Sequence, residues 1–312
     1  MANDAPQPSA ADIEVVNFSR WYGNVVAVND ISFSIGSGIT GLLGPNGAGK
    51  STVLHALSGF LRPSAGSVRV LGKPVWRNPV AYDHLGLVAD REAVYPFLRG
   101  REFVLVNARL HRLADPEQAT AKAIAAVNME DVQDRPTGGY SKGMKQRIKI
   151  AAAIVHDPQV LLLDEPFSGT DPTQRLRMMD SLEAMARQGK TILFSSHVLE
   201  EVERLADNVL VIVGGRLAAS GDFRAIRKLM TDRPHEFTVR STDNRRLAAA
   251  MIADPAVSGV ELKGDSIRVR TQEFAAFTLA APRIAHDQTI RLLELLPTDE
   301  SLESVFSYLV KR

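Results

Sequence analysis

Short apolar runs alternate with longer segments of helical periodicity along the first 230 residues of the chain. β-Branched and leucine-rich runs predict strands, and the segments between most of them place apolar residues three and four positions apart, as in helices that bury one face. This alternation is typical of an α/β domain built on a largely parallel sheet. The predicted strands are 13–17, 31–35, 40–43, 66–70, 85–88, 160–163, 191–194 and 209–213.

One long segment of this domain contains no convincing strand. Residues 99–132 are alanine-rich and carry apolar residues at helical spacing. We therefore expect a helical subdomain at about 91–157 inside an α/β domain that covers 13–230. Residues 1–12, MANDAPQPSAAD, have neither the basic start nor the apolar stretch of a secretory signal, and are expected to form a flexible tail.

The pattern changes near residue 231, where the chain becomes polar and Pro234 discourages a continuing helix. The segments that follow have the order βαββαβ, which predicts a small α+β domain of ferredoxin-like topology over 231–312. A last helix is expected to begin at Asp299. It would present one apolar face made of Leu302, Val305, Phe306 and Leu309. The predicted strands are 235–240, 257–262, 267–270 and 289–296, and the predicted helices 244–252 and 273–281.

Composition excludes several classes of protein. The 312 residues carry a formal net charge of +1, which gives no general basic field for nucleic acid. The absence of cysteine excludes disulfides and thiolate metal ligands, so a cytoplasmic location is the default expectation. The most apolar runs, 160–163 and 209–213, are far shorter than the roughly 18 residues of a membrane helix. Any role at a membrane would therefore require a partner.

The first candidate site is the glycine-rich stretch GPNGAGKS, which follows a predicted strand and precedes a predicted helix. Glycines there let backbone N–H groups turn inward at a helix N-terminus and form an anion site, where a lysine can reach the terminal phosphates of a nucleotide and a serine can bind Mg²⁺. A glycine turn that arose by chance is the alternative. The candidate nucleotide-binding residues are Gly44, Pro45, Asn46, Gly47, Ala48, Gly49, Lys50, Ser51 and Thr52.

Two acidic residues end the buried-type strand in LLLDEP. They would lie at the carboxyl edge of the sheet, where ligands of α/β proteins bind. Asp164 is predicted to hold Mg²⁺ together with Ser51, and Glu165 to polarise the attacking water as a general base. The loop and the two carboxylates together predict a nucleotide hydrolase.

The segment YSKGMKQR, which precedes LLLDEP, resembles the signature motif of the ATPases of ABC transporters, commonly LSGGQ. The resemblance implies that Ser141 and Gly143 bind the γ-phosphate of ATP held by a second subunit. Lys142 and Met144 depart from the commonest residues and resemble the exporter-type branch, as does the ending DESLESVFSYLV. An ordinary helix capped by Ser141 is the alternative.

The resemblance extends over 13–230 and implies further roles. Tyr22 matches the aromatic residue that stacks on adenine, with Trp21 as a competitor. Asp171, in SGTDP, matches the acidic residue of the D-loop that faces the partner subunit. His197, in FSSH, matches the switch histidine that contacts the γ-phosphate. Asp90 stands where the family usually has the glutamine of the Q-loop, so it is either a metal contact through water or a solvated loop acid.

Taken together, these features imply an ABC ATPase cassette that uses ATP and Mg²⁺ and works as a homodimer or heterodimer. The resemblance further implies an exporter whose integral membrane subunits are encoded separately, with the ATPase peripheral on the cytoplasmic face of the cell membrane. The alternatives are a soluble ABC ATPase with a non-transport partner and a regulatory subunit with an inactive site. The latter is disfavoured because Lys50, Asp164, Glu165 and His197 are all present.

Overall fold

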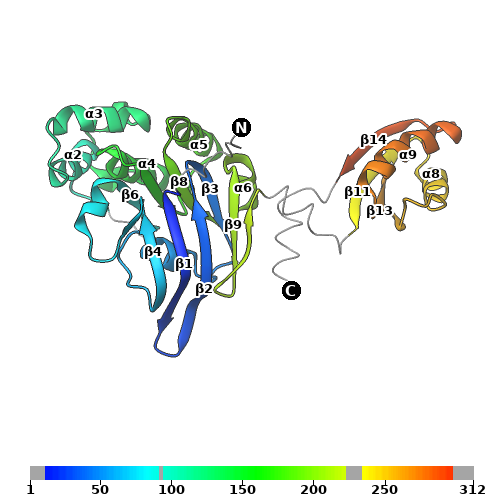
Figure 1. Ribbon diagram of the computed structural model, residues 1–312. Coiled ribbons are helices and arrows are strands. Elements are labelled where there is room, and N and C mark those ends of the chain that lie inside the picture. Colours follow the sequence, from blue (N-terminus) through cyan, green and yellow to red (C-terminus); the bar gives the residue numbers. More distant parts are fainter. Residues whose placement is uncertain (1–10, 91–93, 223–233, 298–312) are drawn as a thin grey trace, which may run out of the picture. The chain divides into compact units, whose positions relative to one another are not determined.

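The computed structural model describes residues 11–90, 94–222 and 234–297 of the chain. It forms two compact units, Met1–Gly221 and Asp222–Arg312, which are described separately (Figure 1). The division precedes the boundary that the sequence predicts at 230/231, and residues 223–233 lie outside the described part. Residues 1–10 of the expected tail lie outside the described part, and Asp12, at its inner end, accepts hydrogen bonds from Thr191 and from the backbone N–H of Leu71.

The centre of the first unit is a six-stranded sheet with the order β10-β9-β3-β8-β7-β6. All neighbouring strands are parallel except β10, which is antiparallel to β9 at one edge. The predicted mostly parallel sheet is therefore present, but the sequence pattern missed β10. The strands are β3 (Gly38–Leu43), β6 (Leu85–Val88), β7 (Val160–Asp164), β8 (Thr191–Ser196), β9 (Asn208–Val213) and β10 (Arg216–Gly221).

A second, antiparallel sheet with the order β2-β1-β4-β5 was not expected. Its strands β1 and β2 form a hairpin much longer than the predicted runs 13–17 and 31–35. The extended parts were missed because bulges shift the register between Val15 and Trp21, which interrupts the apolar alternation that marks a strand. The strands are β1 (Ile13–Tyr22), β2 (Val25–Ile35), β4 (Ala65–Val70) and β5 (Lys73–Pro74).

The helices of the first unit complete its layers. Helix α1 (Lys50–Leu57) contacts strands of both sheets, and the main core lies around it. On the opposite face of the central sheet lie α5 (Pro172–Arg187) and α6 (Leu199–Leu205). The region predicted as a helical subdomain contains α2 (Gly100–Leu110), α3 (Pro116–Ala126) and α4 (Lys142–Ile154), with short 3₁₀ turns at Glu130–Val132 and Thr137–Gly139; a further 3₁₀ turn, Pro79–Asp83, precedes β6.

The second unit has the element order βαββαβ and a four-stranded antiparallel sheet with the order β12-β13-β11-β14. Its core is apolar and includes Phe237, Val269 and Phe277. The predicted helix from Asp299, with Leu302, Val305, Phe306 and Leu309, lies outside the described residues. The elements are β11 (His235–Ser241), α8 (Asn244–Met251), β12 (Gly259–Lys263), β13 (Ser266–Thr271), α9 (Phe274–Asp287) and β14 (Leu292–Pro297).

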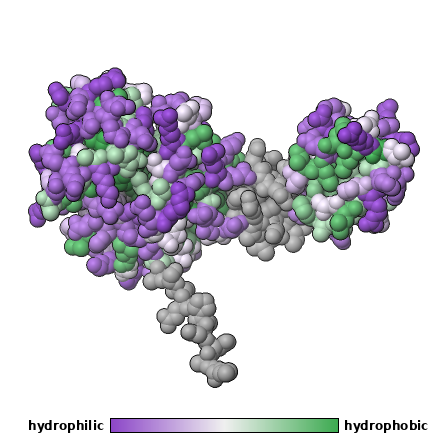
Figure 2. Space-filling view, turned by 90° about the horizontal axis from the view of Figure 1, so that it is seen from above, coloured by the Kyte–Doolittle hydropathy of each residue, from purple (hydrophilic) through white to green (hydrophobic). Residues whose placement is uncertain are grey.

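The surfaces of both units mix hydrophilic and hydrophobic residues on the face seen in Figure 2. Among residues 234–297 of the second unit, the most exposed large hydrophobic side chain is Leu279, which is 70% exposed. Within the described residues, every helix is too short or too polar to cross a lipid bilayer.

Candidate functional site

Four neighbouring strands of the central sheet bring the predicted chemistry to one edge. Strands β3, β8, β7 and β6 are consecutive and parallel, so their carboxyl ends lie side by side. The glycine-rich loop follows β3, His197 follows β8, Glu165 follows β7 and Asp90 comes two residues after β6. Residues separated by more than 150 positions thus meet at the edge where α/β proteins bind ligands.

The loop between β3 and α1 has the tight backbone that its glycines allow. A Cβ atom on Gly44 would lie 2.3 Å from the carbonyl oxygen of Ile212, so the loop could not pack there with any other residue. Gly49 has a φ of +108° and would bring a Cβ within 2.8 Å of the oxygen of Ala27. These constraints leave a concave loop at the N-terminus of α1, the arrangement that binds phosphate.

Lys50 is the first residue of α1 and is only 7% exposed. Its Nζ donates hydrogen bonds to the carbonyl oxygens of Gly44, at 2.7 Å, and of Pro45, at 3.3 Å. Burial lowers the pKa of Lys50, and the charges of Glu165 and Asp164 oppose that shift. The ammonium group is therefore fixed against the loop, and the two acids lie close enough to affect its pKa.

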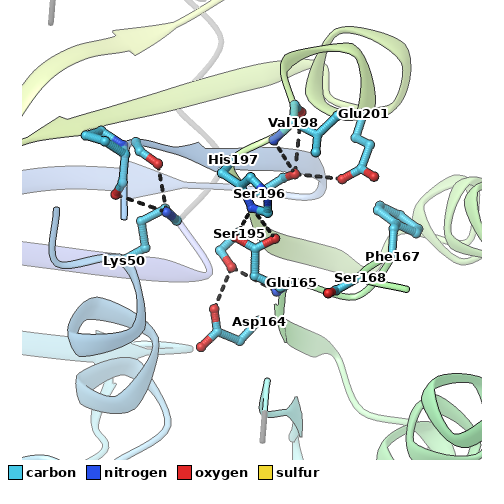
Figure 3. A network of polar contacts seen from close by, with 12 residues as sticks. Lys50, Asp164, Glu165, Phe167, Ser168, Ser195, Ser196, His197, Val198 and Glu201 are labelled. Carbon is cyan, nitrogen blue, oxygen red and sulfur yellow. Dashed lines mark hydrogen bonds and ion pairs between the residues drawn. The ribbon is translucent and has the colours of Figure 1, made fainter. Parts of the chain in front are cut away.

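Asp164 and Glu165 are held by a serine of the neighbouring strand (Figure 3). The Oγ of Ser195 donates to Oδ1 of Asp164 at 2.6 Å and accepts from the backbone N–H of Glu165 at 3.0 Å. Asp164 is buried, at 4% exposed. One hydroxyl therefore orients the acid predicted to bind metal and the backbone of the predicted base.

Glu165 and His197 are in direct contact. The Nδ1 of His197 lies 2.9 Å from Oε2 of Glu165, and the histidine side chain remains 53% exposed, whereas that of Glu165 is 17% exposed. Glu165 has a φ of +49°, in the left-handed region that non-glycine residues rarely occupy. Such residues persist only where the surrounding structure holds them, and they are often found at functional sites.

Behind His197 lies a buried acid that the sequence analysis did not single out. Glu201, on α6, is 5% exposed, accepts a 2.6 Å hydrogen bond from Oγ of Ser196 and forms an ion pair of 3.3 Å with Arg175 of α5. Burial raises the pKa of Glu201, while Ser196 and Arg175 oppose the shift. Glu201 therefore holds Ser196, the residue before His197, and connects Ser196 to α5 through Arg175.

A cavity of about 260 Å³ unites most of these groups. Its lining contains the loop residues 46–52, Asp90, Asp164 and Glu165, together with Ala27. A hydroxyl (Ser51) and carboxylates around one cavity are oxygen donors of the kind Mg²⁺ prefers, so the residues fit the predicted metal. A larger cavity of about 810 Å³, between α3 and α5, contains none of the predicted site residues.

The signature and D-loop residues do not line the 260 Å³ cavity. Ser141 caps α4 by accepting a 3.2 Å hydrogen bond from the N–H of Met144, and Asp171 caps α5 by accepting one of 2.9 Å from Gln174. Gly143, the signature glycine, lies in the first turn of α4 and is buried. Ser141, Gly143 and Asp171 therefore lie in a part of the first unit that is separate from the lining of the 260 Å³ cavity.

The two aromatic candidates for adenine binding are equally exposed, at 46% each. The guanidinium carbon of Arg20 lies 4.7 Å from the ring centroid of Tyr22 and covers one face of that ring. Neither residue lines the 260 Å³ cavity. Both alternatives from the sequence analysis therefore stay open.

Known proteins resemble this chain in sequence. Residues 28–168 match the family model described as ABC transporter. A Nod factor export ATP-binding protein I of Burkholderia orbicola (strain AU 1054) is 40% identical over 219 residues, which cover 68% of this chain and 71% of the relative. Linearmycin resistance ATP-binding protein LnrL of Bacillus subtilis (strain 168) is 32% identical over 309 residues, or 96% of this chain and 98% of the relative.

The fold gives the same result. A solved structure described as the ATP binding subunit of an ABC transporter matches with a TM-score of 0.64 and 27% identity, over 70% of this chain and 92% of that chain. The match covers an α/β cassette, as the sequence predicts. The chain therefore belongs to the ABC transporter family, as an ATP-binding subunit that hydrolyses ATP to drive transport.

Proposed function

We propose that this protein powers an exporter by an ATP-driven closure of two copies or of two related subunits, which acts on separately encoded membrane subunits. The relatives support export, because their names refer to Nod factor export and linearmycin resistance. Those names indicate different cargoes. The ATPase would work at the cytoplasmic face of the membrane, in contact with its membrane partner.

The observation that carries the catalytic proposal is the single cavity shared by the glycine-rich loop and three carboxylates. In this proposal the loop N–H groups and Lys50 bind the phosphates of ATP, as helix N-termini bind anions. Ser51 and Asp164 hold Mg²⁺, with Asp90 at the edge of the site. The bound Mg²⁺ would neutralise charge that develops on the phosphates during transfer.

Glu165 is proposed as the general base for the attacking water. Its carboxylate lies in the cavity lining and contacts His197, which would orient it and reach the γ-phosphate. Ser195 holds the backbone of Glu165 and the carboxylate of Asp164 at once. Catalysis of this kind depends on positioning and electrostatics more than on covalent chemistry.

The separation of the signature and D-loop residues from the nucleotide cavity supports a dimer. Ser141, Gly143 and Asp171 do not line the cavity of their own chain, and Ser141 begins an α-helix whose N-terminus favours anions. In a dimer the signature of one subunit would complete the ATP site of the other. Binding of ATP would then close the dimer, and hydrolysis would open it.

The surface beyond Asp90 is proposed as the contact with the membrane subunits. Tyr95 and Phe97 are 58% and 77% exposed, and their ring centroids lie 5.9 Å apart. Aromatic residues that remain exposed together favour an interaction surface. Since Asp90 lines the nucleotide cavity, this segment would transmit the state of the nucleotide to the partner.

The decisive experiment is Glu165→Gln. The change keeps the shape of the side chain and removes the base, so we expect ATP affinity to stay near the native value and the turnover number to fall by about 10²- to 10⁴-fold. An ATP-bound dimer should accumulate in size-exclusion chromatography. Glu200→Gln, an exposed residue of α6, is the matched control and should keep native turnover. Native turnover in Glu165→Gln would contradict the assignment.

The membrane contact is tested with Asp90→Ala, measured on the complex with its membrane subunits. We expect transport-linked ATPase activity to fall more than ATP affinity, because phosphate affinity comes mainly from the loop and Lys50. Equal losses in both quantities would contradict the coupling role.

Co-purification with the tagged native chain tests the exporter proposal itself. If only soluble proteins co-purify, the alternative of a non-transport partner would replace the exporter.

A further inference from the structure

The backbone of Glu165 is held on both sides. Its N–H donates to Oγ of Ser195 at 3.0 Å, and its carbonyl oxygen accepts from the N–H of Ser168 at 3.2 Å and from Nε2 of Gln146 at 3.4 Å. The left-handed φ of +49° at Glu165 is strained for a non-glycine residue and persists only where neighbours impose it. Gln146 is the one of these neighbours that comes from α4.

Gln146 is a buried amide, at 6% exposed. Buried polar side chains need hydrogen-bond partners, because an unpaired amide loses its hydration without replacement. The partner of its Nε2 is the carbonyl of the proposed catalytic base, 19 residues further along the chain. The sequence pattern gives no sign of this role, because a glutamine in a helix usually faces solvent.

Helix α4 also contacts the loop after Glu165 one turn earlier. Nζ of Lys142 donates to Oγ of Ser168 at 3.1 Å. A Cβ on Gly169 would lie 2.2 Å from Cδ of Lys142, and a Cβ on Gly143 would lie 2.4 Å from Oε1 of Gln174. The first two turns of α4 are therefore packed closely against the segment that runs from the base to α5.

We infer that Gln146 is a positioning residue for ATP hydrolysis, which holds the left-handed backbone of Glu165 so that its carboxylate stays in the cavity. The inference rests on the proposed role of Glu165 as the base. A mechanical consequence follows, because α4 begins at Lys142, directly after its N-cap Ser141, and continues through Gln146 without a break. A displacement of α4 by phosphate at its N-terminus would move the base of the same chain.

The test is Gln146→Leu in the full chain, since leucine fills a similar volume and lacks the donor. We expect the turnover number to fall about tenfold or more, because a base displaced by about 1 Å loses much of its effect. KM for ATP should change by less than about twofold, as for a group that acts only on the chemical step. Melting followed by tryptophan fluorescence would check that the first unit is folded, and Gln146→Met replaces Gln146→Leu if it is not.

Gln159→Leu is the matched control. Gln159 also donates its Nε2 to a backbone carbonyl, that of Gly189 at 2.9 Å, but it lies before the opposite end of β7. The control should keep native turnover. A native turnover number in Gln146→Leu, or a rise in KM with unchanged turnover, would overturn the inference.

A double variant separates positioning from general destabilisation. If Gln146 acts through Glu165, adding Gln146→Leu to Glu165→Gln should cause no further loss in single-turnover hydrolysis. A further loss equal to that in the native background would overturn the inference. The single variant Glu165→Gln in the same assay tests the proposed base by itself: slow Glu165→Gln beside native Gln146→Leu would refute only the role of Gln146.

Discussion

The two units of the chain place their charged residues in opposite ways. Among the described residues, every buried charged side chain belongs to the first unit: Lys50, Lys149, Asp164 and Glu201. In the described part of the second unit, 234–297, the core is apolar and the only buried polar residues are Ser241 and Thr271. Arginines and glutamates on its strands β11, β12 and β13 pair with one another. Buried charge has a high energetic cost, so it marks the unit that performs chemistry.

The stability of the second unit should therefore depend mainly on apolar packing. Phe237→Ala removes a ring that is fully buried against Phe274 and Phe277, and should lower the free energy of unfolding of this unit by about 3–5 kcal/mol. Both tryptophans, Trp21 and Trp76, belong to the first unit. Calorimetry should therefore show the lower stability of the second unit, whereas tryptophan fluorescence, which reports on the first unit, should not change. A matching shift in fluorescence would show that the units unfold together.

Lys50→Met should separate function from stability in the first unit. Loss of a charge-assisted contact to phosphate should weaken ATP binding by about 1.5–3 kcal/mol, or about 10- to 150-fold in Kd. Because burial lowers the pKa of Lys50, the folded protein holds its ammonium at a cost, and removal should leave the nucleotide-free melting temperature equal or higher. Titration calorimetry measures the change in ATP affinity, and thermal melts measure the stability without nucleotide. A lower melting temperature in Lys50→Met would contradict the prediction on stability.

Glu201→Gln should change how stability depends on pH. Burial raises the pKa of Glu201 above its ordinary value near 4.5, so the folded state binds this proton more tightly than the unfolded state does. Stability from this group is therefore greatest below that ordinary value and falls as pH rises through the raised pKa. The groups that face it are Ser196, Arg175, Glu165 and His197.

The variant lacks this titration, so the native chain should lose stability relative to Glu201→Gln as pH rises above about 4.5. Urea unfolding followed by tryptophan fluorescence at several pH values measures the difference. A difference that stays constant with pH would show that Arg175 compensates the buried charge fully.

The smallest effect is expected on the charged face of the second unit. Arg270 pairs with Glu236 at 3.1 Å and with Glu261 at 3.8 Å, and its side chain is 48% exposed. Exposed ion pairs are screened by water, so Arg270→Ala should change the free energy of unfolding of this unit by less than about 1 kcal/mol. Calorimetry at low and high salt measures it. A loss as large as that of Phe237→Ala would remove the contrast between the units.

Local patterns were enough to predict the α/β class, the glycine-rich loop and the acids after β7. Glycines are required where a Cβ would strike backbone, as at Gly44, and an apolar run followed by two acids marks a buried strand that ends at a ligand edge. The βαββαβ order of the second unit follows from its short-range periodicity in the same way.

The contacts that these residues make became known from the three-dimensional arrangement. Ser195, Gln146 and Glu201 are ordinary residue types whose roles come from partners brought close by strand order and helix packing. The antiparallel sheet and β10 were also missed, because bulges and polar faces hide a strand from its apolar pattern. Periodicity reports which face of an element is buried, whereas a hydrogen bond between distant residues depends on the relative placement of whole elements, which no local pattern encodes.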